Sequence, residues 1–264
     1  MGYRSGVRPS EWIAFSYFLY LVVACWWPPL PAGRRARLIA GAALAAVAVW
    51  AVAHEAPPLI RDWAPLAYIL GGYFLSGLLF VVPSAGIESW LLGWDRRLFG
   101  DPTRRFANWP RPIVAGLEII YMGCFLLVPA GLAILSYHGM ASLADRYWTL
   151  VMGAEFGAFA PLAFIQTRPP WAIERKPVLT DPVIHRLASQ MVQHLTIHAN
   201  TFPSGHAAGS LAVGLAVVGV LPWTGALLLS LAAGICVACV VGRYHYAVDV
   251  VSGAALALAI WIMN

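Results

Sequence analysis

The stretch "HAAGSLAVGLAVVGVLPWTGALLLSLAAGICVACVV", residues 206–241, consists of two apolar runs separated by a short Leu-Pro-Trp turn. It contains no Asp, Glu, Lys or Arg. A chain segment in the lipid interior must satisfy its backbone hydrogen bonds within itself, and an apolar helix does so. We therefore predict two membrane helices, near 206–221 and 225–241, both of them short and rich in glycine.

The rest of the chain has the same character. Of its 264 residues 60% are hydrophobic and 11% are charged, and its mean hydropathy is +0.72, far above that of soluble domains. Further apolar runs of membrane-spanning length lie near 12–29, 38–54, 64–82, 113–136, 147–166 and 246–263. The sequence predicts an all-α fold, a polytopic transmembrane bundle of about six to eight spans in one integral membrane domain over residues 1–264.

Two segments between the apolar runs are predicted to form interfacial helices. Residues 84–112 mix Trp, Leu and Phe with arginines, which is typical of a segment that lies on the membrane surface. Residues 181–200 begin with Asp-Pro, and their apolar residues recur at helical spacing, which indicates a second surface helix.

The stretch "TFPSGHAAGS", residues 201–210, places polar groups at the start of an apolar run. Free backbone N–H groups at a helix N-terminus attract anions, and Gly205 lets a ligand approach the backbone closely. A hydroxyl from Ser204 and an imidazole from His206 beside such a terminus suit a phosphate. The simpler alternative is that Ser204 only caps the helix.

A second polar motif, "GRYHYAVDVVSG" at residues 242–253, also leads into an apolar run. His245 and Asp249 are four residues apart, so they share one face of a helix. A carboxylate bound to one imidazole nitrogen leaves the other nitrogen available as base or nucleophile. A structural His–Asp pair is the alternative, but ionisable groups at the end of a membrane helix usually serve function.

A third motif, "QTRPPW" at residues 166–171, supplies Arg168. A guanidinium fits phosphate oxygens as a rigid fork, so Arg168 is a candidate anion clamp; an interfacial anchor is the alternative. If the spans are eight, residues 30–37, 83–112, 167–205 and 242–245 lie on the face opposite the termini. All three motifs then meet on one membrane face, where they can form one site.

The motifs "RP" (168–169), "PSGH" (203–206) and "HYAVD" (245–249) resemble the three-part signature of the type 2 phosphatidic-acid phosphatase superfamily. The resemblance extends over about 168–256, and we expect the catalytic core to span approximately 113–264. The stretch "WDRRLFGDPTRR" (94–105) is in addition similar to the branch that contains inositol phosphorylceramide synthases.

The resemblance implies a role for each motif residue. His245 would attack phosphorus and form a phosphohistidine, His206 would protonate the leaving group, and Asp249 would orient His245. The remaining residues, which would hold the phosphoryl oxygens, are Arg168, Ser204 and Gly205. The resemblance implies no metal and no other cofactor.

The chain departs from the family pattern at two positions. Pro161 stands where the first motif usually has a lysine, and no spacing rule selects Arg175 or Lys176 as its replacement. Cys239 stands where the third motif usually has an arginine, whereas Arg243 lies two residues before the histidine. On a helix these offsets differ by only about 40° in direction and about 6 Å in rise. We therefore include Arg243 among the residues predicted to bind phosphate.

Four further residues are weaker candidates. Glu118 and Glu155 are carboxylates within predicted spans, where they would line a substrate or proton path or form helix–helix hydrogen bonds. His194 and His198 have the spacing of a metal-binding pair, but no third ligand is evident, so a partly exposed interfacial face is the favoured interpretation.

The sequence thus predicts a membrane lipid phosphatase or phosphotransferase that acts through a phosphohistidine. Its expected partners are a lipid phosphate, membrane lipids and an alcohol or polyol acceptor, without nucleic acid. The alternative is a non-catalytic transporter or lipid-binding member of the family. The complete set of two histidines and one aspartate argues against that alternative, because a binding protein needs no nucleophile.

The expected location is the plasma (inner) membrane, as a multi-pass protein, and two arguments disagree about the face on which the site opens. The motif face would carry 13 of the 17 Lys and Arg residues and the opposite face the other 4. By the positive-inside rule this asymmetry predicts a cytoplasmic site. The family resemblance implies an extracytoplasmic one instead.

Overall fold

The computed structural model describes residues 6–174, 187, 190 and 196–264. Within these ranges every regular element is a helix, and the one β-type contact is an isolated bridge between Thr167 and Asn200. The predicted all-α class is confirmed.

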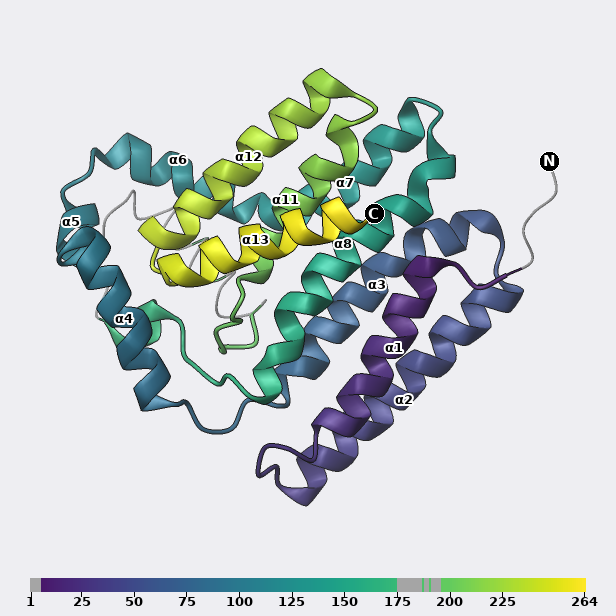
Figure 1. The fold of residues 1–264 in the computed structure, drawn as a ribbon, viewed down its shortest axis with the longest axis horizontal. Helices are drawn as coiled ribbons and strands as arrows, with labels where there is room; N and C mark the ends of the chain where they lie inside the picture. The colour runs from purple at the N-terminus through teal and green to yellow at the C-terminus, as the bar shows by residue number, and fades with distance from the viewer. Residues whose placement is uncertain (1–5, 175–186, 188–189, 191–195) are drawn as a thin grey trace.

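The N-terminal half of the fold consists of three long helices that pack against one another (Figure 1). They are α1 (Pro9–Ala24), α2 (Ala32–Glu55) and α3 (Pro58–Gly77). Both α1 and α3 also pack against α8 (Ala144–Phe159), which joins this half to the rest of the chain. Two 3₁₀ turns, Ala141–Leu143 and Ala160–Ala163, flank α8.

The C-terminal half is built around α11 (Gly205–Val218), which contacts α8 and α7 (Cys124–Tyr137). It also contacts α12 (Pro222–Val241) and α13 (Ala247–Met263). A Cβ atom on Gly225 would overlap the backbone of Val218 on α11. The glycine content of these two helices therefore lets α11 and α12 pack with their backbones close together.

The predicted interfacial segment 84–112 forms two short helices, α4 (Ala85–Phe99) and α5 (Pro102–Ala107). α4 crosses the end of the bundle and contacts α13 (Figure 1). Next comes α6 (Arg111–Met122), which packs against α12. The loop after α8 contains a single helical turn, α9 (Pro170–Ile173).

One sequence prediction needs correction. The span expected at 113–136 is not one helix, because α6 and α7 meet at an angle of 57° near Gly123, and glycine is a common site of sharp helix bends. The surface helix expected at 181–200 lies mostly outside the described residues. Of its described residues, Leu187 and Gln190 are helical and exposed, and residues 196–200 are not helical.

The helices carry the apolar surface of a membrane protein. On α2, Leu44 and Val47 are 71% and 64% exposed, which is costly in water and favourable in lipid. Among the described residues, α2 and α12 are by themselves long and apolar enough to cross a bilayer, and α6 with α7 makes a third candidate if the bent pair is one span.

The count of six to eight spans is not confirmed by length and composition. α1, α11 and α13 are apolar but have only 16, 14 and 17 residues. At about 1.5 Å per residue, a helix of this length reaches roughly 21 to 26 Å, short of a hydrocarbon core about 30 Å thick.

Candidate active site

A cavity of about 520 Å³ lies among α3, α7, α8 and α11. Its walls are mainly apolar, and Leu70 and Phe74 of α3 are among the lining residues that remain about half exposed. Its polar lining includes His206 and His245. The described residues that line it include no lysine or arginine.

The two motif histidines meet at this cavity although they are 39 residues apart in the chain. His245 Nε2 lies 3.4 Å from His206 Nδ1, and His206 Nε2 lies 3.4 Å from the hydroxyl of Tyr121. The Tyr121 ring stacks on His206 on one side and on Tyr244 on the other, with centroid distances of 5.2 and 3.9 Å. The aromatic stack therefore holds His206 beside His245.

The turn after α12 determines where His245 lies. Tyr244 N donates to Cys239 O and Arg243 N donates to Val240 O, the pair of bonds that defines a Schellman helix end. Arg243 takes the left-handed position of this turn, with φ of 59°, where glycine is usual. His245 N also donates to Cys239 O, so the turn fixes the backbone of the histidine itself.

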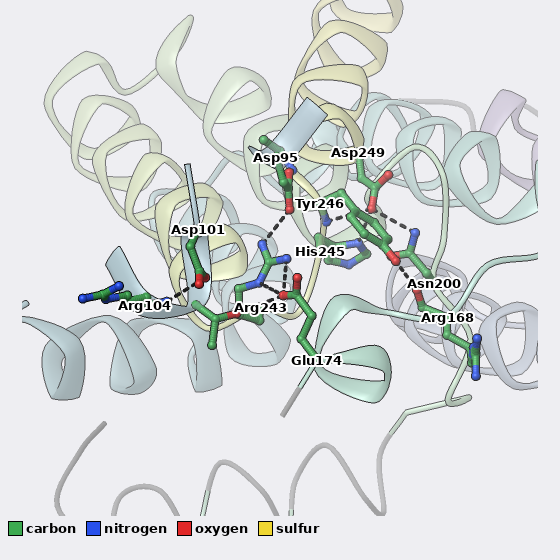
Figure 2. A network of polar contacts seen from close by, with 12 residues as sticks. Asp95, Asp101, Arg104, Arg168, Glu174, Asn200, Arg243, His245, Tyr246 and Asp249 are labelled. Carbon is green, nitrogen blue, oxygen red and sulfur yellow. Dashed lines mark hydrogen bonds and ion pairs between the residues drawn. The ribbon is translucent and has the colours of Figure 1, made fainter. Parts of the chain in front are cut away.

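Asp249 links the two histidine motifs. Its Oδ2 lies 3.4 Å from His245 Nδ1 and accepts hydrogen bonds from Asn200 Nδ2 at 2.9 Å and Tyr246 N at 3.0 Å (Figure 2). Its backbone carbonyl accepts a bond from Ser204 N. The carboxylate that is expected to orient His245 is thus itself held in place.

Asn200 is a site residue that the sequence analysis did not identify. Besides Asp249, its side chain binds the Thr167 hydroxyl at 3.1 Å, and its backbone N–H donates to Thr167 O. Asn200 precedes the Ser-Gly-His motif by several residues and belongs to no spacing pattern, so the sequence offered no signal for it.

Burial lowers the pKa of His245 to about 3. The imidazole is therefore neutral at pH 7, which leaves a nitrogen lone pair free to act as nucleophile. A carboxylate close to Nδ1 favours the positive charge that develops when Nε2 forms a bond. The arrangement of His245 and Asp249 suits nucleophilic catalysis by the imidazole.

Ser204 and Gly205 occupy the N-terminus of α11. Ser204 is fully buried, and its Oγ accepts a hydrogen bond from Ala207 N, so it does cap the helix. Gly205 N donates to the Thr201 hydroxyl, and a Cβ at this position would lie 2.7 Å from the Phe159 ring. A larger residue at this position would therefore force the Phe159 ring of α8 to move.

Arg168 has its guanidinium on Glu88 of α4. Two bonds of 2.9 and 3.0 Å join the side chains, and a third joins Arg168 N to the same carboxylate at 2.8 Å. Hydrogen bonds and charge from Arg168 outweigh the burial of Glu88 and lower the pKa of that carboxyl. In Figure 2 the guanidinium points away from His245, although Arg168 O accepts a bond from the Tyr246 hydroxyl.

Arg243 has two carboxylate partners. Its Nη1 lies 2.6 Å from Asp95 Oδ2, and its Nη2 lies 2.7 Å from Glu174 Oε2 (Figure 2). Asp95 Oδ1 also accepts a bond from Ala247 N at the start of α13. Neither Arg243 nor Arg168 is among the described residues that line the cavity.

In this structure both terminal nitrogens of Arg243 are paired with carboxylates, and its role as a phosphate ligand stays a prediction. The sequence analysis placed it by its offset along the chain, which gives no information about the carboxylate of α4 that tertiary packing brings to it. Arg175 and Lys176, the other basic candidates, lie outside the described residues.

The weaker candidates also differ in whether they line the cavity. Glu155 and His198 line the cavity, Glu118 does not, and His194 lies outside the described residues. Within the part of the chain that the structure describes, no three His, Cys, Asp or Glu side chains are grouped so that they could hold a metal ion.

The comparison with protein families agrees with the site. The sequence model of the PAP2 superfamily matches residues 89–263, from α4 to the end of α13, which is 175 of 264 residues. The chain belongs to this superfamily, whose members are phosphatases and phosphotransferases that act on phosphate-containing substrates. No match was found among curated proteins, and none among solved structures.

Proposed function

We propose that this PAP2 superfamily protein is an integral membrane enzyme that cleaves or transfers a lipid-linked phosphate through a phosphohistidine on His245. One observation carries the proposal. A pair of histidines, with nitrogens 3.4 Å apart, lines a cavity of about 520 Å³ whose walls are mainly apolar. A phosphate at the histidines and an acyl chain along the apolar wall fit this arrangement.

The chemistry proceeds in two displacements at phosphorus. His245 Nε2 attacks, the bond from phosphorus to the lipid oxygen breaks, and His206 gives that oxygen a proton. Asp249 stabilises the positive charge on the imidazole of His245. Water or an alcohol then attacks phosphorus, the phosphorus–nitrogen bond breaks, and His206 takes the proton from the attacking oxygen.

The phosphoryl oxygens need positive partners. A distance of 3.4 Å between the histidine nitrogens leaves no room for phosphorus, so the rings move apart when substrate enters. Arg168 is 43% exposed and has one carboxylate partner, which leaves it able to exchange Glu88 for a phosphate. The α11 N-terminus with Ser204 and Gly205 supplies the other side of the phosphate site.

The finer assignment follows the sequence resemblance. We propose transfer to an alcohol or polyol as the main reaction, as in the inositol phosphorylceramide synthase branch, with hydrolysis when water replaces the acceptor. The catalytic core is residues 113–264 in a multi-pass protein of the plasma (inner) membrane. Six to eight spans then require that the short helices α1, α11 and α13 cross a locally thinned bilayer.

A trapping experiment tests the function. The purified protein is mixed with phosphatidic acid that carries a labelled phosphate, and the labelled enzyme is tested for the acid lability of a phosphohistidine. We expect label on the wild type and none on His245→Ala. His206→Ala should turn over far more slowly, and Asp249→Asn should keep a small residue of activity.

Two outcomes decide against this proposal. A correctly folded His245→Ala protein that releases phosphate at the normal rate would exclude the nucleophile. Binding of phosphatidic acid without label on the enzyme and without turnover would support the non-catalytic alternative, a transporter or lipid-binding protein.

We propose that the site opens to the cytoplasm, because the excess of basic residues on its face exceeds what phosphate binding needs. Arg34, Arg35 and Arg37 belong to this excess, and they lie far from the histidine motifs in sequence. A cysteine placed in the 96–105 segment and probed on intact cells with an impermeant thiol reagent tests the orientation. Labelling without permeabilisation would place the site outside.

A further inference from the structure

Glu155 has no role in the chemistry above, yet it lines the same cavity. It projects from α8 against the glycine face of α11. A Cβ on Gly209 would overlap Glu155 Oε1, and one on Gly205 would lie 3.2 Å from Oε2. Two glycines one helical turn apart therefore provide the space that the carboxylate occupies.

No hydrogen bond or ion pair joins the half-buried carboxylate of Glu155 to another residue that the structure describes. The described cavity lining also offers no lysine or arginine as a counter-charge. A carboxylate in apolar surroundings is unfavourable unless a polar group binds it. Its position at the cavity wall makes a bound molecule the natural source of that group.

The position of Glu155 indicates which part of the substrate it meets. His206 and Ser210 each follow one of these glycines on α11, so they lie on the adjacent face of the helix. Both line the cavity. His206 is the proposed proton donor to the leaving oxygen and the proton acceptor from the attacking one. Glu155 therefore lies against the same segment of α11, residues 205–210, as His206, the residue proposed to exchange a proton with the alcohol oxygen.

We propose that Glu155, with Ser210, forms a hydroxyl-binding subsite that selects acceptor alcohols carrying a second hydroxyl group. This inference rests on the proposed function. The reactive hydroxyl oxygen attacks phosphorus on His245, the phosphorus–nitrogen bond breaks, and the proton goes to His206. The second hydroxyl donates a hydrogen bond to Glu155, which neither gains nor loses a proton.

The test compares two acceptors that differ by one hydroxyl group. The labelled phosphoenzyme is chased with ethylene glycol or with ethanol at equal concentration, and the ratio of the two transfer rates is measured. We expect the wild type to favour ethylene glycol by up to about tenfold, because one hydrogen bond is at stake. The ratio is internal to each variant, so a partly inactive preparation does not change it.

Glu155→Leu should bring the ratio close to one, and Glu155→Gln should lower it by a smaller factor, since an amide still accepts a weaker bond. Ser210→Ala should lower the ratio by a few-fold, and this variant tests the subsite if the Glu155 variants do not fold. The matched control is Glu118→Gln, a buried carboxylate outside the cavity lining, which should keep the wild-type ratio.

The outcomes separate the two proposals. Absence of a phosphoenzyme in the wild type contradicts the proposed function, and this inference with it. A phosphoenzyme that shows no preference for ethylene glycol overturns the hydroxyl subsite alone. An equal preference in wild type, Glu155→Leu and Ser210→Ala also overturns it.

Discussion

Two regions beside the cavity each contain an arginine that the sequence nominates for phosphate binding, and they differ in how the arginine is held. In the loop after α8, the Arg168 side chain is 43% exposed, and among the described residues it forms an ion pair with Glu88 alone. In the turn after α12, the Arg243 side chain is 3% exposed and pairs with Asp95 and Glu174. The same residue type thus occurs once at the surface and once in the interior.

The difference teaches what each arginine is able to do. A half-exposed guanidinium loses little when it exchanges one anion for another, because water screens both states. A buried guanidinium that leaves its carboxylates exposes uncompensated charge in the interior, which is strongly unfavourable. We infer that Arg168 is available to substrate and that Arg243 stabilises the left-handed turn that presents His245.

The largest expected effect is the loss of stability in Arg243→Ala. Removal of the guanidinium leaves Asp95 buried without its partner, at a cost of about 3 to 5 kcal/mol in the free energy of unfolding. Unfolding in detergent measures this cost. The matched control is the exposed Arg96→Ala on the same helix as Asp95, expected to change the free energy by less than about 0.5 kcal/mol. If Arg243→Ala is stable but forms no phosphoenzyme, the result would show that Arg243 acts in phosphate binding and not in stability.

The next effect is on catalysis by Arg168→Lys. Lysine keeps the charge but loses the planar fork, so we expect kcat to fall by roughly ten- to a hundredfold, with little change in stability. Phosphoenzyme formation from phosphatidic acid measures the rate. Wild-type kinetics in both Arg168→Lys and Arg168→Ala would make Arg168 an anchor and remove the distinction between the two arginines.

A smaller effect is expected for Glu88→Gln, which removes the anion that competes with substrate for Arg168. An amide of the same shape keeps a hydrogen bond to Arg168 N. If Arg168 exchanges partners, KM for the lipid phosphate should fall by up to about fivefold, within the range of exposed ion pairs. A higher KM would show instead that Glu88 positions Arg168 for the phosphate.

The smallest effect is a pH dependence of stability from the same pair. The pKa of Glu88 is lower in the folded protein than in the unfolded chain, so the pair contributes stability above the unfolded pKa. This contribution, under about 1 kcal/mol because Arg168 is half exposed, is lost as the pH falls through the folded pKa. Unfolding measured from about pH 6 to about pH 3 should show it in the wild type and not in Glu88→Gln.

Much of the helical architecture was predictable from the sequence. Every apolar run that was assigned to a span is helical over most of its length, although the run at 113–136 is divided into α6 and α7 and several bounds differ by five to seven residues; segment 84–112 forms separate helices. Helices follow from local composition and apolar length, which a sequence displays directly. The bend at Gly123 was missed because a glycine inside an apolar run permits a kink without requiring one.

The site was predictable only in part. The motifs named His206, His245 and Asp249, and the structure places these three together. Asn200, Glu88 and Asp95 were missed, because each acts by contact with a residue far away in the chain. For the same reason the sequence did not distinguish Glu155, which faces the cavity, from Glu118, which does not.

The sequence by itself determined the all-helical class, the apolar character of the protein and the candidates for the reactive side chains. These follow from residue type and local spacing. Only the tertiary structure decided which charged groups are partnered: Arg243 by two carboxylates, Arg168 by one, and Glu155 by none among the described residues. The physical reason is that the energy of a charge depends on burial and on neighbours within a few ångströms, and in this fold those neighbours come from distant parts of the chain.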